Sequence, residues 1–147
     1  MKATRKNKKN QKTTKKQKLK NNPVFKRYKN KPKLAIKHLM KIKKGEALEA
    51  LYREDIGYVD IIWGDEKHGL CHIIKKHKNE IKQLGFEVED FIPIIFQYGE
   101  FNKKKSKDSK IVLDSQMFRI IISTHYFGEE RKWLLSAFDL RKKARKK

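Results

Sequence analysis

The chain has only one cysteine, Cys71, among its 147 residues, so an internal disulfide is excluded. A single cysteine fits a protein of the reducing cytosol. No stretch approaches the roughly 18 to 20 apolar residues of a membrane-spanning helix, and no signal-peptide apolar segment follows the basic N-terminus. We therefore expect no membrane segment and a cytoplasmic place of action, reached either directly or by delivery into a target cell.

Acidic residues are missing from both ends of the chain. Residues 1–33 carry 15 Lys or Arg and residues 141–147 carry 6 more, and neither segment contains Asp or Glu. Residues 34–140 hold 18 basic and 17 acidic side chains, although the whole chain has a net charge of +22. The charge therefore lies in two tails around a nearly neutral domain, and such tails attract a polyanion, most simply nucleic acid.

Apolar side chains are also scarce near the N-terminus, where Lys, Asn, Gln and Thr predominate. Such a segment buries too little surface to offset the entropy of ordering it. We predict a disordered or irregular basic arm over 1–33, a single domain over 34–140 and a basic tail over 141–147. The arm either aids solubility or binds phosphates, and Phe25 and Tyr28 at its end are candidates to dock or stack.

Hydrophobic periodicity predicts the elements of the domain. The expected elements are helices within 33–55 broken at Gly45, a strand near 57–63, a helix over about 69–84, a short helix within 88–101, and a three-stranded meander over 110–139. This order indicates the α+β class, with N-terminal helices packed on a roughly four-stranded antiparallel sheet.

Three histidines and the cysteine fall within "GDEKHGLCHIIKKH", residues 64–77. On a helix, His77 lies in the apolar stripe and His72 about 140° away. Their rings therefore converge on a ligand only if the helix begins late, near His72, with its N-terminus facing that ligand. The alternatives are a core residue for His77 and a surface residue for His72. A zinc site is disfavoured, because Cys71 and His72 are adjacent and no second cysteine exists.

Two polar residues interrupt the apolar strands of the predicted meander, namely Arg119 and Ser136. A buried arginine needs an anionic partner, and a substrate phosphate serves where no protein carboxylate does. Two alternatives to a phosphate site stay open. Either the sheet face is open to solvent with ordinary polar alternation, or Asp60 is an internal partner of Arg119.

The segments "GYVDIIWGDEKHGLCHIIKKH" and "FRIIISTHYFGEERKWLLSAFD" together resemble the barnase/EndoU/colicin/RelE-like nuclease superfamily. More narrowly, they are similar to its phage-associated branch of endoribonuclease toxins, over roughly residues 45–140. The resemblance implies N-terminal helices packed on a four-stranded antiparallel sheet. It also implies an endoribonuclease that needs no metal or other cofactor, in which the ribose 2′-hydroxyl attacks the adjacent phosphate to give a cyclic phosphate.

By position, the resemblance assigns proton transfer to His72 and His77, phosphate stabilisation to Arg119 and a phosphate anchor to Ser136. Histidine serves as acid or base near neutral pH, and a fixed guanidinium stabilises the charge that the phosphorane gains. Further candidates for contacts with backbone phosphates are Lys75, Lys76 and Lys132. Trp63 is a candidate to stack on a base, and the alternative is a tryptophan packed in the core.

The implied partner is RNA, such as tRNA or another structured RNA, and an acidic immunity or antitoxin protein would complement a basic toxin. Two alternatives are noncatalytic. One is a nucleic-acid-binding protein with an inactive nuclease-like fold, and the other is a phage packaging protein whose tails neutralise nucleic acid. The basic tails fit all three functions, so only the constellation of site residues separates them.

Overall fold

The computed structural model describes residues 22–140, and the predictions for 1–21 and 141–147 lie outside this range. The described elements are, in chain order, β1 (Val24–Phe25), α2 (Pro32–Ile42), β2 (Glu46–Arg53), β3 (Gly57–Ile62), α3 (Leu70–Gln83), α4 (Val88–Tyr98), β4 (Glu100–Phe101), β5 (Lys110–Asp114), β6 (Phe118–Tyr126) and β7 (Glu129–Asp139). The α+β class is confirmed. None of these helices is both long and apolar enough to cross a lipid bilayer.

The described strands form one mixed sheet of seven strands in the order β1-β2-β3-β7-β6-β5-β4. The meander β5-β6-β7 is antiparallel, as predicted. The prediction of a four-stranded antiparallel sheet is wrong in size and direction, because β1 joins β2 and β3 joins β7 in parallel. The strands β1 and β4 have two residues each, which is too short to show a period of two in the sequence.

The segment Glu46–Arg53 is a strand, although its apolar residues recur at helical spacing. Ala47, Ala50 and Leu51 are all buried. The pairing of β2 with β3 shifts register between Ala47 and Leu51, and Glu49 has a φ of 54°. A bulge thus turns residues three and four apart toward the same core. The predicted helix after Gly45 is therefore wrong, and of the expected N-terminal helices the described residues contain α2 alone.

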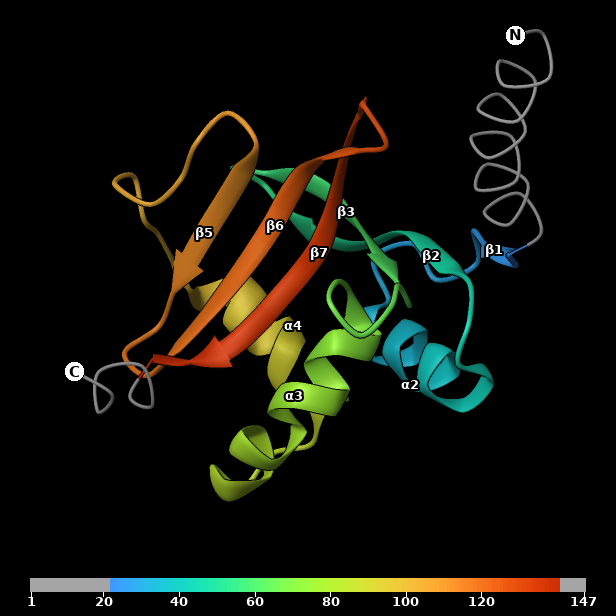
Figure 1. Ribbon diagram of the computed structural model, residues 1–147, viewed down its shortest axis with the longest axis horizontal. Coiled ribbons are helices and arrows are strands. Elements are labelled where there is room, and N and C mark those ends of the chain that lie inside the picture. The colour runs from blue at the N-terminus through green and yellow to red at the C-terminus, as the bar shows by residue number, and fades with distance from the viewer. Residues whose placement is uncertain (1–21, 141–147) are drawn as a thin grey trace, which may run out of the picture.

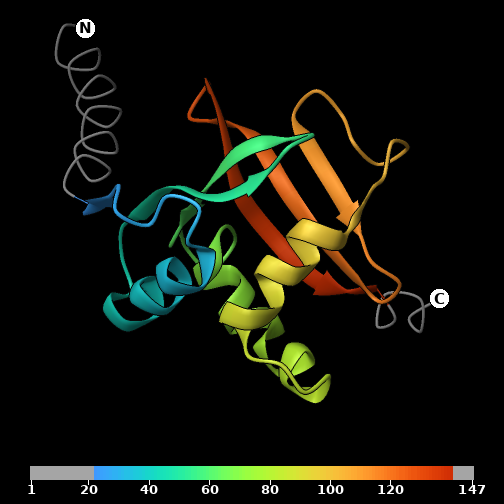
Figure 2. The ribbon, with the colours of Figure 1, turned by 180° about the vertical axis from the view of Figure 1, so that it is seen from behind.

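The helices leave one face of the meander uncovered. Figure 2 shows α2 and α4 in front of the sheet, on the side where the core lies. Fully buried side chains of these helices, including Ile36 and Phe96, pack there with Ile120 and Leu134 of the strands. Figure 1 looks onto the opposite face of β5, β6 and β7, in front of which no described helix lies.

Helix α3 closes the edge of β7 beyond the point where β3 pairs with it. That pairing is at Trp133, so the later residues of β7 need other partners on this side. The N–H of Gly69 donates to the carbonyl of Leu135 at 2.8 Å, and the N–H of Asp139 donates to Glu80 Oε2 at 3.1 Å. Helix α3 and the residue before it therefore cover this edge of β7, and the helix lies beside the uncovered face.

The segment just before α2 packs on the domain. Strand β1 lies parallel to β2, and the rings of Phe25 and Tyr28 approach His38 of α2, with centroids 4.6 and 5.4 Å apart. Both aromatic side chains are partly buried against the core. The two aromatic residues at the end of the basic arm therefore dock.

Candidate active site

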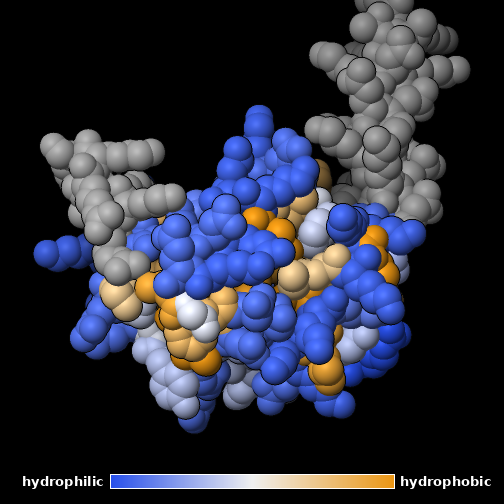
Figure 3. Space-filling model, turned by 90° about the horizontal axis from the view of Figure 1, so that it is seen from below, coloured by the Kyte–Doolittle hydropathy of each residue, from blue (hydrophilic) through white to orange (hydrophobic). Residues whose placement is uncertain are grey.

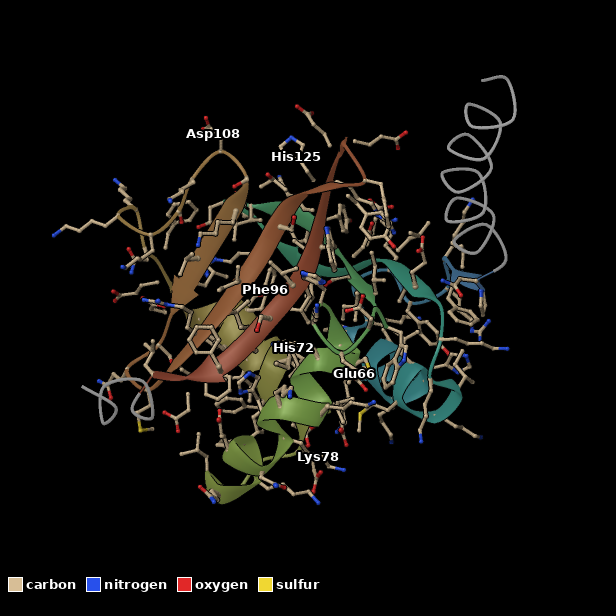
Figure 4. The ribbon with its side chains drawn as sticks, in the orientation of Figure 1. Glu66, His72, Lys78, Phe96, Asp108 and His125 are labelled. Atoms are coloured by element: carbon tan, nitrogen blue, oxygen red, sulfur yellow. The ribbon has the colours of Figure 1, made fainter. Side chains whose placement is uncertain are left out.

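The rings of His72 and His77 meet near the start of α3. Their centroids are 5.3 Å apart and their planes are inclined by 77°. The helix begins at Leu70, so the rings converge without the late start that the helical wheel required. Helical side chains lean toward the N-terminus, which brings the ring of His77 back toward the first turn. Figure 4 shows His72 at the junction of α3 with β7.

The loop before α3 orients the ring of His72. Its Nδ1 lies 2.9 Å from the carbonyl oxygen of Glu66. Since a carbonyl only accepts, the neutral ring carries its proton on Nδ1 and presents a lone pair at Nε2. The side chain is partly exposed. This is the arrangement that a general base needs.

His77 has a different environment. Its Nδ1 lies 3.1 Å from Glu80 Oε2, and the two side chains are 19% and 9% exposed. The ring also packs beside Phe138 of β7, with centroids 5.9 Å apart. A carboxylate on one ring nitrogen fixes the orientation of an imidazole and stabilises its protonated form by charge. The surroundings of His77 therefore suit a general acid, and its side chain is partly exposed rather than fully enclosed in the core.

The loop itself is a closed turn that tolerates only glycine at one position. The N–H of Asp65 donates to the carbonyl of His68 at 2.9 Å, and Asp65 Oδ1 accepts two backbone N–H bonds at 2.8 and 2.9 Å. Gly64 has a φ of +72°, and a Cβ there would lie 2.1 Å from the carbonyl oxygen of His68. This closed geometry positions the Glu66 carbonyl that holds His72.

The uncovered sheet face continues from His77 onto β7 and β6. Phe138 lies opposite Arg119, and Ser136 lies opposite Ile121. These four strand residues are partly exposed, whereas alternate positions of both strands belong to the core. The four residues predicted for catalysis thus occupy neighbouring elements of one surface, with the two histidines at its rim.

Arg119 is paired with a carboxylate that sequence reasoning did not consider. Its Nε and Nη2 donate to Asp114 Oδ1 and Oδ2 at 2.7 and 3.0 Å. The suggested partner Asp60 instead accepts from Arg131 Nε at 2.5 Å, so that alternative is wrong. The bonds to Asp114 use two of the five guanidinium N–H donors, and the Arg119 side chain stays 15% exposed. Asp114 therefore supplies the anionic partner that a buried arginine needs, and a phosphate is not required for that purpose. Only the remaining N–H donors of Arg119 are available to a substrate phosphate.

The Asp114–Arg119 pair predicts a pH-dependent contribution to stability. Burial alone raises the pKa of Asp114, but hydrogen bonds from Arg119 and Asn102 and the charge of Arg119 hold it below its ordinary value of 3.8. Such a group stabilises the fold fully above the ordinary value, and this contribution is lost as the pH falls through the lower, folded value. We expect Asp114→Asn to lower the free energy of unfolding by about 1–3 kcal/mol at pH 7.

Urea unfolding followed by circular dichroism measures this contribution. The difference between wild type and Asp114→Asn should be constant at neutral pH and shrink as the pH falls below the ordinary value of 3.8. A difference that does not change with pH would show that the charge of Asp114 contributes nothing.

The predicted lysine contacts are dispersed over the molecule. Lys75 Nζ lies 2.8 Å from Glu66 Oε1 on the loop before α3, and Lys76 is exposed on the same helix. Lys132 Nζ donates to the carbonyl of Ile56, near the opposite end of β7 from the histidines. The structure therefore places two of the three lysines on the helix of the histidine pair and one away from it.

Two cavities lie between the loop before α3 and the β6–β7 hairpin. One, of about 220 Å³, is lined by residues that include Asp65, His68, Tyr126, Phe127 and Trp133. The other, of about 380 Å³, is lined in part by Trp63, which is half-buried and also packs against the core. Both are away from the predicted catalytic residues, at the hairpin end of β7.

Sequence reasoning missed several residues of this region. Glu80 could have been found, because residues three apart on a helix face each other and Glu80 follows His77 at that spacing. Phe138 could have been found from its parity with Ser136. The cavity residues of the loop and the hairpin tip gave no signal, since no period connects segments so far apart in the chain.

The part of the chain that the structure describes has no group of three or more His, Cys, Asp or Glu side chains arranged to hold a metal ion. Cys71 is buried. Seen from below, the surface is mainly hydrophilic, with hydrophobic side chains in small patches (Figure 3).

Comparison with known proteins gives a family match. The model of the family described as phage-Barnase-EndoU-ColicinE5/D-RelE like nuclease1 matches residues 50–144. The match begins within β2 and ends beyond β7, so it contains both histidines of α3 and the polar residues of the uncovered face. No curated protein and no solved structure matches the chain.

Proposed function

Because the chain belongs to the phage-Barnase-EndoU-ColicinE5/D-RelE like nuclease1 family, we propose that it is an endoribonuclease that needs no metal ion. The observation that carries this proposal is the pair of imidazole rings, 5.3 Å apart, with unlike partners. One Nδ1 faces a carbonyl and the other faces a largely buried carboxylate. Two titratable groups in unlike environments are the usual signature of a paired base and acid.

The proposed reaction is an internal transesterification. His72 Nε2 accepts the proton of the ribose 2′-hydroxyl while that oxygen attacks the adjacent phosphorus. The bond from phosphorus to the 5′-oxygen then breaks, and His77 donates a proton to the departing oxygen. The products are a 2′,3′-cyclic phosphate and a 5′-hydroxyl. His72 and His77 thus account for both proton transfers of the reaction. Because their rings are close together, both can reach a single phosphodiester.

The polar residues of the uncovered face complete the proposal. We assign contacts with the nonbridging phosphate oxygens to the Ser136 hydroxyl and to the remaining N–H donors of Arg119, because charge develops there in the transition state. Lys75 and Lys76 are proposed to contact neighbouring phosphates. The basic tails add affinity that does not depend on sequence and that falls with salt.

A biological role goes with this chemistry. We propose a toxin or effector of a phage or mobile element that acts on tRNA or another structured RNA. Support comes from the phage named in the family description and from the net charge of +22. A charge of that size would favour an acidic inhibitor as a partner.

The test incubates wild type, His72→Ala and His38→Ala with total RNA in EDTA. His38 packs on Phe25 and Tyr28, away from the site, so its replacement controls for the loss of a histidine as such. Wild type and the control should degrade the RNA, and His72→Ala should not. A different result would support a noncatalytic nucleic-acid-binding protein. In that case the wild type would bind RNA without cleaving it, and a protein without its basic tails would no longer bind.

A further inference from the structure

We propose that the cavity of about 220 Å³ between the loop before α3 and the β6–β7 hairpin is a nucleobase subsite. We call it the base cavity. The lining residues that would bind the base are Asp65, Tyr126, Phe127 and Trp133. It is proposed to take a purine whose N–H donors face Asp65 and to disfavour uracil. The inference rests on the proposed function for its substrate, whereas the binding itself is measurable without cleavage.

Phe127 is the first indication that the hairpin tip binds a ligand. Tyr126 pairs with Glu129, so the hairpin loop is Phe127–Gly128, with φ values of 50° and 82°. Two positive φ values are typical of a type I′ turn, whose first position favours Asn, Asp or Gly. Phenylalanine there is strained, and its side chain is 59% exposed. A phenylalanine at this position stabilises neither the turn nor the core. A strained, exposed residue of this kind points to a function.

The other aromatic residues form a rigid wall. The rings of Tyr126 and Trp133 meet edge to face, with centroids 5.1 Å apart, and those of Tyr126 and Phe127 meet in the same way at 4.7 Å. Trp133 Nε1 donates to the carbonyl of His125 at 2.8 Å, which fixes the indole. Aromatic rings that are already ordered can stack on a base with little loss of side-chain entropy.

Asp65 supplies discrimination between bases. Its Oδ1 accepts two backbone N–H bonds of the loop and lies 3.5 Å from His68 Nδ1, so the carboxylate has a fixed orientation and Oδ2 is the oxygen that faces a base. The side chain is 69% exposed at the cavity wall. A fixed carboxylate accepts bonds from the amino and imino groups of a base and repels carbonyl oxygens. Guanine offers two adjacent N–H donors, whereas uracil presents two carbonyl groups.

The neighbouring cavity of about 380 Å³ gives the nucleic acid a path onward. It shares Phe127 with the base cavity and adds Lys43 and Lys44, both exposed, which suit the next phosphate. In the other direction Trp133 precedes Ser136 by three positions in β7, a distance of about 10 Å. A nucleic-acid strand can therefore run from these lysines past the base cavity to the histidine pair.

The experiment titrates His72→Ala with guanosine 3′-monophosphate, uridine 3′-monophosphate and inorganic phosphate while tryptophan fluorescence is recorded. These ligands have no phosphodiester bond to cleave, so the titration reports binding alone. We expect guanosine 3′-monophosphate to bind at least about tenfold more tightly than the other two, because neither of them combines a purine stack with N–H donors.

Phe127→Asn, made in the same background, is the matched variant. Asparagine suits the turn, so the urea midpoint should stay or rise, while the affinity for guanosine 3′-monophosphate falls about tenfold through the lost stack. Asp65→Asn keeps an Oδ1 acceptor for the loop and should reduce the preference over uridine severalfold. A third measurement, cleavage of mixed-sequence RNA by wild type, should map to sites next to a purine.

Equal affinity for the two nucleotides, or an unchanged affinity in Phe127→Asn, overturns the base cavity. Those results, together with RNA cleavage that ignores base identity, would leave the proposed function standing. The opposite pattern, purine binding by a wild type that does not cleave RNA, would remove the proposed function and keep the subsite.

Discussion

Replacing His72 with alanine is expected to lower the rate of RNA cleavage by about 10²- to 10⁴-fold, and His77→Ala should have an effect of the same size. Each variant removes one of the two groups that transfer protons, while the fold keeps its core. Because the two histidines act on the same phosphodiester, the double variant should lose much less than the product of the two single losses. Single-turnover cleavage of a labelled oligoribonucleotide measures all three rates.

Glu80→Gln separates a chemical role of His77 from a structural one. The amide keeps a hydrogen-bond acceptor near His77 Nδ1 and removes the charge that stabilises the imidazolium. If His77 is the acid, Glu80→Gln should slow cleavage of RNA much more than cleavage of a substrate whose leaving group needs no protonation. An equal loss on both substrates would make the contact merely structural.

Gly64→Ala is expected to lower the rate of cleavage by about 10²-fold, although this residue contributes no side chain to the site. A Cβ at this position lies 2.1 Å from the carbonyl oxygen of His68, and the φ of +72° adds backbone strain. The loop must open to relieve the clash, and the carbonyl of Glu66 moves with it. His72 then loses the hydrogen bond that fixes its ring.

Gly85→Ala is the matched control for this prediction. Gly85 has a similar φ, +88°, but nothing lies within 4 Å of a Cβ built there. It therefore carries the strain of a positive φ without the clash and should keep its activity. If both variants lost the same fraction of kcat/KM at equal stability, the closed loop would not be what positions His72.

The parts of the fold that could be predicted from the sequence are those with a local period. Helix α3 and the meander show apolar residues at helical or alternating spacing, and Arg119 and Ser136 stood out as polar residues within those apolar strands. Strand β2 was mistaken for a helix because its bulge puts Ala47, Ala50 and Leu51 on the core side at helical intervals. Propensity and period cannot reveal a bulge that depends on the partner strand.

The candidate site was predictable only in part, for a similar reason. The histidines stood out by type and spacing, but their convergence depends on side-chain direction and on the edge of β7 that α3 covers. The partner of Arg119 depends on the β5–β6 register, which places Asp114 opposite it. The base cavity joins segments about sixty residues apart in the chain, and no pattern in either segment points to the other.

The chemical identity of the cleaved ends tests the two-histidine mechanism most directly. An oligoribonucleotide is incubated with the wild-type protein in EDTA, beside a copy with a 2′-deoxynucleotide at the cleaved position, and the products are weighed by mass spectrometry. The mechanism predicts 2′,3′-cyclic phosphate and 5′-hydroxyl ends from the first substrate and no cleavage of the second at that position. Ends with a 3′-hydroxyl and a 5′-phosphate, or cleavage of the deoxy substrate there, would contradict it.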